Sequence, residues 1–208
     1  MWLRRLGSSS LALLAAIALT PRVAQAVPYI VTLAQQGNSV VAIGSGAFNL
    51  DGLTIYAGAD PALGAVWPVS GYLYTGGALT NLDVYAGFTG PTSFGSGGGT
   101  GASTVIGDSV AIVGSNDFYG LPLFFLPTGY VSGTALVSGA VWNNASFASL
   151  GIMPGTYTWT WGTAADQSFT LMTASAVPEP ATLGMFGIGM LLIGGLAALR
   201  RPGQRPTA

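Results

Sequence analysis

The chain has 208 residues, of which 50% are hydrophobic and 6% charged, and it contains no His and no Cys. Arginines are its only cations, so imidazole, thiol and amine chemistry is absent; we therefore expect no serine triad, no papain-like site, no histidine-ligated zinc and no cofactor. All six arginines lie outside residues 27–176, whose only charged side chains are six aspartates with a formal charge of −6, which excludes binding to nucleic acid or to anionic lipid.

The N-terminus has the features of a cleaved signal peptide. A pair of arginines precedes a short apolar run, and the small residues Ala24 and Ala26 stand at the positions that signal peptidase reads before Val27. We predict a signal helix within residues 1–26, recognised by the secretory translocon and cut after Ala26. The twin-arginine route is disfavoured because Gly and Ser follow the arginines, and an uncleaved anchor is disfavoured because Pro21 ends the run.

Residues 27–176 predict one mainly β domain. Their composition is rich in Gly and in β-branched and aromatic residues, and short alternating runs are separated by turn residues. No segment between the signal helix and residue 181 has a helical period. Such a pattern is typical of an antiparallel β-sandwich, jelly-roll-like in its many short strands. The predicted strands are residues 29–34, 39–43, 47–50, 53–57, 72–75, 82–86, 109–113, 130–137, 140–147, 155–161 and 167–172.

The clearest strand contains an aromatic row. With a period of two, Tyr157, Trp159 and Trp161 share one face and threonines share the other. Residues 167–171 alternate in turn, which indicates a hairpin with this strand. The row is interpreted as sandwich core, and a platform for stacking sugar rings is the alternative.

Two further patterns are weaker. Residues 53–58 resemble residues 82–87. Two copies are too few for a solenoid, so the similarity indicates equivalent strands that end in glycine turns. A duplicated half-sandwich is the alternative. The glycine-rich run at residues 95–101 lacks the lysine of a phosphate-binding loop. It predicts a flexible loop between strands.

Carboxylates offer the remaining route to catalysis. A glycosidase needs two carboxyl groups about 5 to 10 Å apart, and a hairpin could bring Asp51 to Asp60 or Asp108 to Asp117. Turn chemistry explains these residues more simply, since Asp51 precedes a Gly and Asp60 a Pro. A few carboxylates could hold calcium, but no Asp-x-Asp-x-Asp-Gly loop is present, and we expect no metal site.

The C-terminal segment, residues 177–208, predicts one membrane-spanning helix. Residues 181–199 carry no charge, and a helix of that length nearly matches the hydrocarbon core of about 30 Å. Arg200 and Arg201 follow as a stop, so the positive-inside rule leaves residues 200–208 in the cytoplasm and the preceding domain outside. Pro178 and Pro180 keep the chain before the helix extended and accessible to an enzyme.

This segment resembles the PEP-CTERM sorting signals of Gram-negative bacteria that produce exopolysaccharide. The resemblance rests on Val177, Pro178, Glu179 and Pro180, within a motif at residues 177–183, followed by the apolar helix and the arginine pair. It implies recognition by a membrane-embedded exosortase, removal of the helix, and release or attachment at the cell surface. The strand with the aromatic row and residues 89–95 and 145–151 are similar to uncharacterised ectodomains that carry such signals, which implies a shared β fold and no known active residue.

These observations predict a non-enzymatic protein that is exported across the inner membrane and held briefly by a single helix. An exosortase-like enzyme then processes it into the cell-surface or biofilm exopolysaccharide matrix. The neutral Ser- and Thr-rich surface suits contact with polysaccharide. The alternatives are a carboxylate-dependent glycosidase or carbohydrate-binding module that acts on secreted polysaccharide, and a permanently tail-anchored envelope protein.

Overall fold

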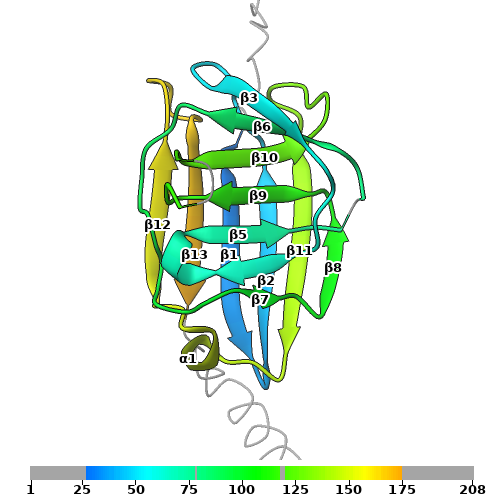
Figure 1. Ribbon diagram of the computed structural model, residues 1–208, viewed down its shortest axis with the longest axis vertical. Coiled ribbons are helices and arrows are strands. Elements are labelled where there is room, and N and C mark those ends of the chain that lie inside the picture. The colour runs from blue at the N-terminus through cyan, green and yellow to red at the C-terminus, as the bar shows by residue number, and fades with distance from the viewer. Residues whose placement is uncertain (1–26, 78, 118–119, 175–208) are drawn as a thin grey trace, which may run out of the picture.

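The computed structural model of the chain describes residues 27–77, 79–117 and 120–174. These residues form two β-sheets packed face to face, and the strands of one sheet run across those of the other (Figure 1). The two-layered, mainly β fold predicted from the sequence is confirmed. The predicted signal helix and the predicted membrane helix lie outside the described residues.

The first sheet has six strands. Its spatial order is β12 (Gly155–Thr160), β13 (Ser168–Ala174), β1 (Tyr29–Gln36), β2 (Ser39–Gly46), β11 (Leu136–Asn143) and β8 (Thr104–Gly107). The pair β12 and β13 is the hairpin expected from the sequence. The first and last of these segments in the chain, β1 and β13, pair in parallel, which corrects the expectation of a fully antiparallel sandwich.

The second sheet has seven strands, all paired antiparallel. Their order is β3 (Thr54–Ala59), β6 (Leu82–Ala86), β10 (Leu123–Pro127), β9 (Val110–Val113), β5 (Tyr72–Thr75), β4 (Ala65–Trp67) and β7 (Thr100–Gly101). The two segments with similar sequences, 53–58 and 82–87, form β3 and β6, which are neighbours in this sheet. Of these two similar segments, only residues 82–87 end in a glycine with a positive φ, Gly87, whereas Gly58 lies within β3.

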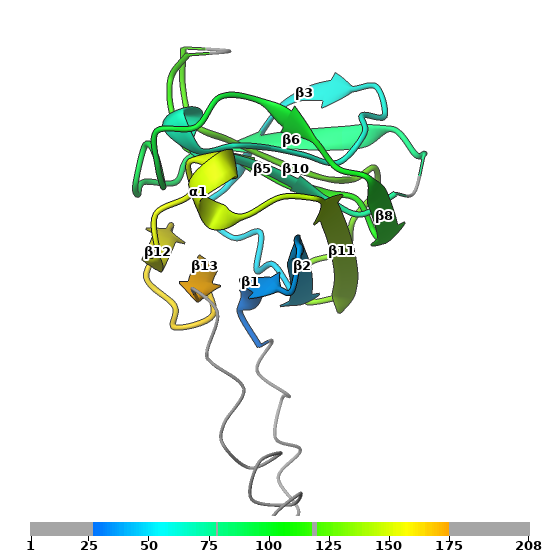
Figure 2. The ribbon, with the colours of Figure 1, turned by 90° about the horizontal axis from the view of Figure 1, so that it is seen from below.

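Two short helical turns complete the fold. A 3-10 turn, η1, covers Pro68–Ser70, and α1 covers Phe147–Leu150 beside one end of the space between the sheets (Figure 2). Ser146 caps α1, since its hydroxyl accepts a hydrogen bond from the amide of Ser149 while the Ser149 hydroxyl accepts one from the amide of Ser146. The prediction of no helix before residue 181 is wrong here, because one turn is too short to show a period.

Three predicted strands are wrong in whole or in part. Residues 47–50 form no strand, since the Phe48 amide donates to the hydroxyl of Tyr130 instead of to a neighbouring strand. The expected strands at 130–137 and 140–147 are one strand, β11, which starts only at Leu136 because a turn at Gly133 precedes it. It ends at Asn143, beyond which Asn144 has a φ of 53°.

The space between the sheets is filled by a buried aromatic core. Phe48 lies at its centre and stacks with Tyr29 and Trp161, at centroid distances of 5.1 and 6.0 Å. A second, smaller apolar cluster lies on the outer face of the seven-stranded sheet and includes Tyr74, Val113 and Phe125. This outer cluster positions the candidate site.

Candidate functional site

The residues predicted for sorting follow the last strand of the domain. β13 ends at Ala174, held between β12 on one side and β1 on the other. Val177, Pro178, Glu179, Pro180, Arg200 and Arg201 lie outside the described residues, as do Ala24 and Ala26. Val27, the predicted first residue of the exported protein, is described: its carbonyl accepts a hydrogen bond of 2.9 Å from the amide of Ala47.

The aromatic row of β12 belongs to the core. Trp159 and Trp161 are buried, and their indole N–H groups donate to the backbone carbonyls of Pro91 and Asn49 at 2.8 and 2.7 Å. Tyr157 is partly buried and packs against the same cluster. The interpretation as core is confirmed, and these rings do not form a sugar platform.

A different set of aromatic side chains lines a pocket on the outer face of the seven-stranded sheet. Trp67 and Tyr72 are cross-strand partners on β4 and β5, and Tyr72 is in turn the partner of Val113 on β9. Because directly opposed residues point to the same face, these side chains form one row. Leu73, between the two tyrosines of β5, points to the core instead.

A second row lies beside the first. Tyr74 is flanked in register by Ala65 on β4 and Ala111 on β9, and Ala111 is opposed by Phe125 on β10. The two alanines have short side chains, so the sheet face is hollow around the larger rings. The pocket has a volume of about 460 Å³.

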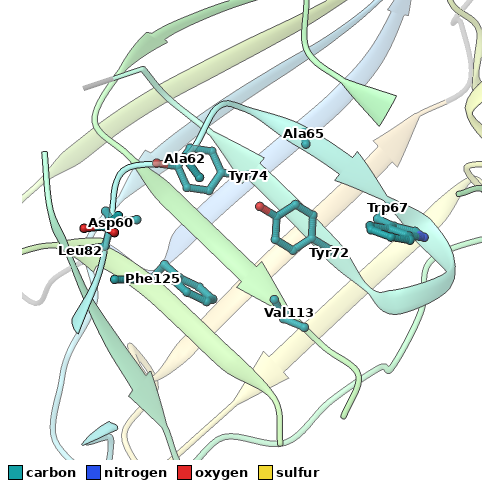
Figure 3. A pocket seen from close by; sticks show the side chains of 10 residues that line it. Asp60, Ala62, Ala65, Trp67, Tyr72, Tyr74, Leu82, Val113 and Phe125 are labelled. Atoms are coloured by element: carbon teal, nitrogen blue, oxygen red, sulfur yellow. The ribbon is translucent and has the colours of Figure 1, made fainter. Parts of the chain in front are cut away.

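The segment between β3 and β4 forms one wall of the pocket (Figure 3). It contributes Asp60 and Ala62, beside Ala59 at the end of β3, and Asp60 is the only charged side chain among the lining residues. The pocket therefore combines flat aromatic surfaces with one carboxylate. Such a mixture is typical of sites for small organic ligands.

One polar group at this pocket has no partner. The side chain of Tyr74 is 1% exposed, and its buried hydroxyl makes no hydrogen bond. A buried hydroxyl without a partner is rare and costs stability. In Figure 3 the Tyr74 ring lies among the lining residues of the pocket.

The carboxylate pairs considered from the sequence are not brought together. Asp51 and Asp60 lie beyond opposite ends of β3, whose six residues span about 20 Å. Asp108 accepts a hydrogen bond from the amide of Val137 and Asp117 one from the hydroxyl of Ser70, at opposite ends of β9. The interpretation as turn residues is confirmed for Asp51 and Asp117.

A pair that the sequence did not suggest shares a shallow cavity. Asp60 and Asp83 both line a depression of about 370 Å³ beside β3 and β6. Asp83 accepts a hydrogen bond of 2.9 Å from the amide of Gly129. In the part of the chain that the structure describes, no three Asp, Glu, His or Cys side chains are grouped as a metal site would require.

The glycine-rich run is not a loop that stands apart from the fold. Its last part forms β7, and the amides of Ser96 and Gly97 donate to the carbonyl of Gly151, which caps α1. The Gly97 carbonyl accepts from the amide of Val69. The prediction of a flexible loop is therefore corrected to a segment bound on both sides.

The pocket residues Trp67, Tyr72 and Tyr74 were not predicted from the sequence. A signal was present, because Tyr72 and Tyr74 alternate with Leu73 in a strand whose bounds were predicted correctly. Nothing in the sequence indicated that the outer face of this strand lines a hollow.

Among residues 27–174, as far as the structure describes them, no helix is long and apolar enough to cross a membrane. Searches against curated proteins and against solved structures returned no match. Residues 176–201 match the PEP-CTERM protein-sorting motif, which implies export and sorting to the cell surface by an exosortase. The chain thus contains a β-rich domain that is followed by a PEP-CTERM sorting motif.

Proposed function

We propose that the protein is a non-enzymatic constituent of the cell surface or of the exopolysaccharide matrix. An exosortase removes its C-terminal helix, so that the β-sandwich becomes the mature product. The observation that carries this proposal is the spacing between fold and motif: β13 ends at Ala174 and the sorting motif begins at residue 176.

This spacing makes the folded domain and the processing site immediate neighbours. From Ala174 to Pro178 four residues reach at most about 14 Å. A cut near Pro178, Glu179 and Pro180 therefore releases the whole sandwich with only a short C-terminal extension. Because β13 is paired on both sides, the cut leaves the sheet intact.

The charge of the domain supports a place among neutral polymers. The described residues contain aspartates and no Lys, Arg or His, so the domain repels anionic polymers and cannot neutralise them. Its remaining polar surface consists of hydroxyl and amide groups. These groups exchange hydrogen bonds with uncharged polysaccharide as readily as with water.

The experiment is to measure the intact mass and the location of the mature protein. Cells with and without the exosortase are compared, together with Glu179→Ala and with Asp51→Ala as a control in an exposed turn. We expect loss of the helix and surface release in the parent and in Asp51→Ala, and retention of the full chain in the other two cases. A full-length C-terminus in every strain would instead establish a permanently anchored envelope protein.

The cavity shared by Asp60 and Asp83 favours one second candidate, a carboxylate-dependent glycosidase. Asp60→Asn and Asp83→Asn are compared with Asp51→Asn for breakdown of the secreted polymer. Activity that is lost in either of the first two and kept in the third would make the protein an enzyme. Equal behaviour of all three leaves the non-enzymatic proposal in place.

A further inference from the structure

We propose that the pocket lined by Trp67, Tyr72, Tyr74 and Asp60 binds an uncharged sugar ring. This inference rests on the proposed function only for the source of the ligand, which would be a neutral polysaccharide at the cell surface. The binding itself requires no sorting and can be tested on the isolated protein.

The aromatic rings provide the stacking surface. Trp67 is 38% exposed and lies in register with Tyr72 on the neighbouring strand. The ring of Trp67 packs closely against Gly99, since a Cβ atom on that glycine would lie only 3.0 Å from the ring. A rigid, partly exposed aromatic face suits the apolar C–H face of a pyranose.

The charge of the pocket selects against anionic ligands. Asp60 is its only charged lining residue, and no cation stands among the residues that line it. A phosphate or a uronic acid would meet a carboxylate without any compensating charge. A neutral sugar can instead donate a hydroxyl hydrogen bond to that carboxylate.

The hydroxyl of Tyr74 is buried at the pocket wall, so only a ligand that displaces part of this wall can reach it. This group lacks a hydrogen-bond partner, and an alkyl chain or a quaternary ammonium group could not supply one. A sugar hydroxyl can both donate and accept. The volume of about 460 Å³ lies within the range of about 300 to 1,000 Å³ that is usual for ligand sites.

The test is calorimetric titration of the full chain in a polyoxyethylene detergent, which has no sugar headgroup. The probes are maltotriose, cellotriose and laminaritriose as neutral sugars, with trigalacturonate and choline as charged probes. We expect at least one neutral trisaccharide to bind and neither charged probe to do so. Binding of either charged probe in preference, or failure of all three neutral sugars, overturns the inference whatever the outcome of the sorting experiment.

Variants test the assigned residues. Trp67→Ala should weaken binding about tenfold. Tyr74→Phe should weaken it about threefold to tenfold while raising the midpoint of thermal unfolding, because it removes a hydroxyl that has no partner. Tyr56→Ala is the control, since this tyrosine is 51% exposed and does not line the pocket. Equal affinity in parent and Tyr74→Phe, or an equal loss in Tyr56→Ala, contradicts the assignment.

Discussion

The hydroxyls of Tyr29 and Ser138 lie 2.6 Å apart in the buried core, and the Ser138 hydroxyl lies 2.6 Å from that of Thr75 as well. Tyr29 and Ser138 belong to the six-stranded sheet, whereas Thr75 lies on β5 of the other sheet. The group therefore joins the two sheets by hydrogen bonds. Gly44 makes room for it, because a Cβ atom there would lie 2.6 Å from the Tyr29 hydroxyl.

Removal of the central hydroxyl should destabilise the sandwich. In Ser138→Ala the buried Tyr29 hydroxyl loses its partner, whereas Thr75 keeps a 3.3 Å bond to the carbonyl of Val110. We expect the free energy of unfolding to fall by about 2 kcal/mol, the cost of one unsatisfied buried hydroxyl. Urea denaturation measures it, with the exposed Ser45→Ala as control, expected within about 0.5 kcal/mol of the parent. Equal stability of the two variants would show that the bond contributes nothing.

Tyrosine ionisation should set the alkaline limit of stability. Burial raises the pKa of Tyr29 well above its ordinary value, and it also raises the pKa of Tyr85 and of Tyr130. The unfolded chain then releases protons from pH about 10 upward while the folded chain keeps them. Stability from these groups is fully present below pH 10 and is lost as the pH rises beyond it.

Unfolding free energies measured from pH 8 to 11.5 check this expectation. The described residues contain no Lys, His or Cys side chain that would titrate in the same range. Tyr29→Phe removes the most strongly shifted group, so its stability should decline less steeply above pH 10 than that of the parent. An identical slope in both proteins would assign the alkaline loss to other groups.

The sequence predicted most of the strands that turn residues flank and missed β10. β5 and β6 were located at their true bounds because turn residues flank short alternating runs. β10 was missed because Leu123–Pro127 is an apolar run without alternation, buried on both faces of the sheet. The strand at 47–50 was predicted in error because the Tyr130 hydroxyl, distant in sequence, replaces a strand as partner of the Phe48 amide.

The candidate pocket shows where local patterns stop being informative. The alternation of Tyr72 and Tyr74 with Leu73 predicts that both tyrosines share a face. Which face is covered depends on the neighbours β4 and β9 and on the segment after β3. The more conspicuous aromatic row of Trp159 and Trp161 turned out to be core because the second sheet covers it.

Two adjacent glycines should differ sharply in their tolerance of a methyl group. A Cβ atom on Gly97 would collide with the carbonyl oxygen of Leu150, whereas one on Gly98 would meet nothing within 4 Å. Gly97→Ala must push the end of the α1 turn away from the glycine-rich run, and we expect a loss of about 2 kcal/mol. Gly98→Ala, one residue away, should stay within about 0.5 kcal/mol of the parent. Thermal and urea unfolding of both variants measure the difference, and equal values would mean that the contact is not rigid.

Tyr74→Phe should make the protein more stable. The hydroxyl of Tyr74 is buried without a hydrogen bond, whereas unfolding returns it to water, so its presence favours the unfolded state by about 1 kcal/mol. The phenyl ring keeps the packing against the outer cluster. We therefore expect the free energy of unfolding to rise by about 1 kcal/mol in urea denaturation.

Tyr29→Phe is the matched control for this measurement, because it removes a buried tyrosine hydroxyl that does have a partner, Ser138. It should lower stability where Tyr74→Phe raises it. If both variants lose stability, the Tyr74 hydroxyl has a partner in solution, such as an ordered water. If only Tyr29→Phe loses stability, the Tyr74 hydroxyl is a polar group that lowers the stability of the native protein. Such a cost is expected of a residue that is kept for a ligand.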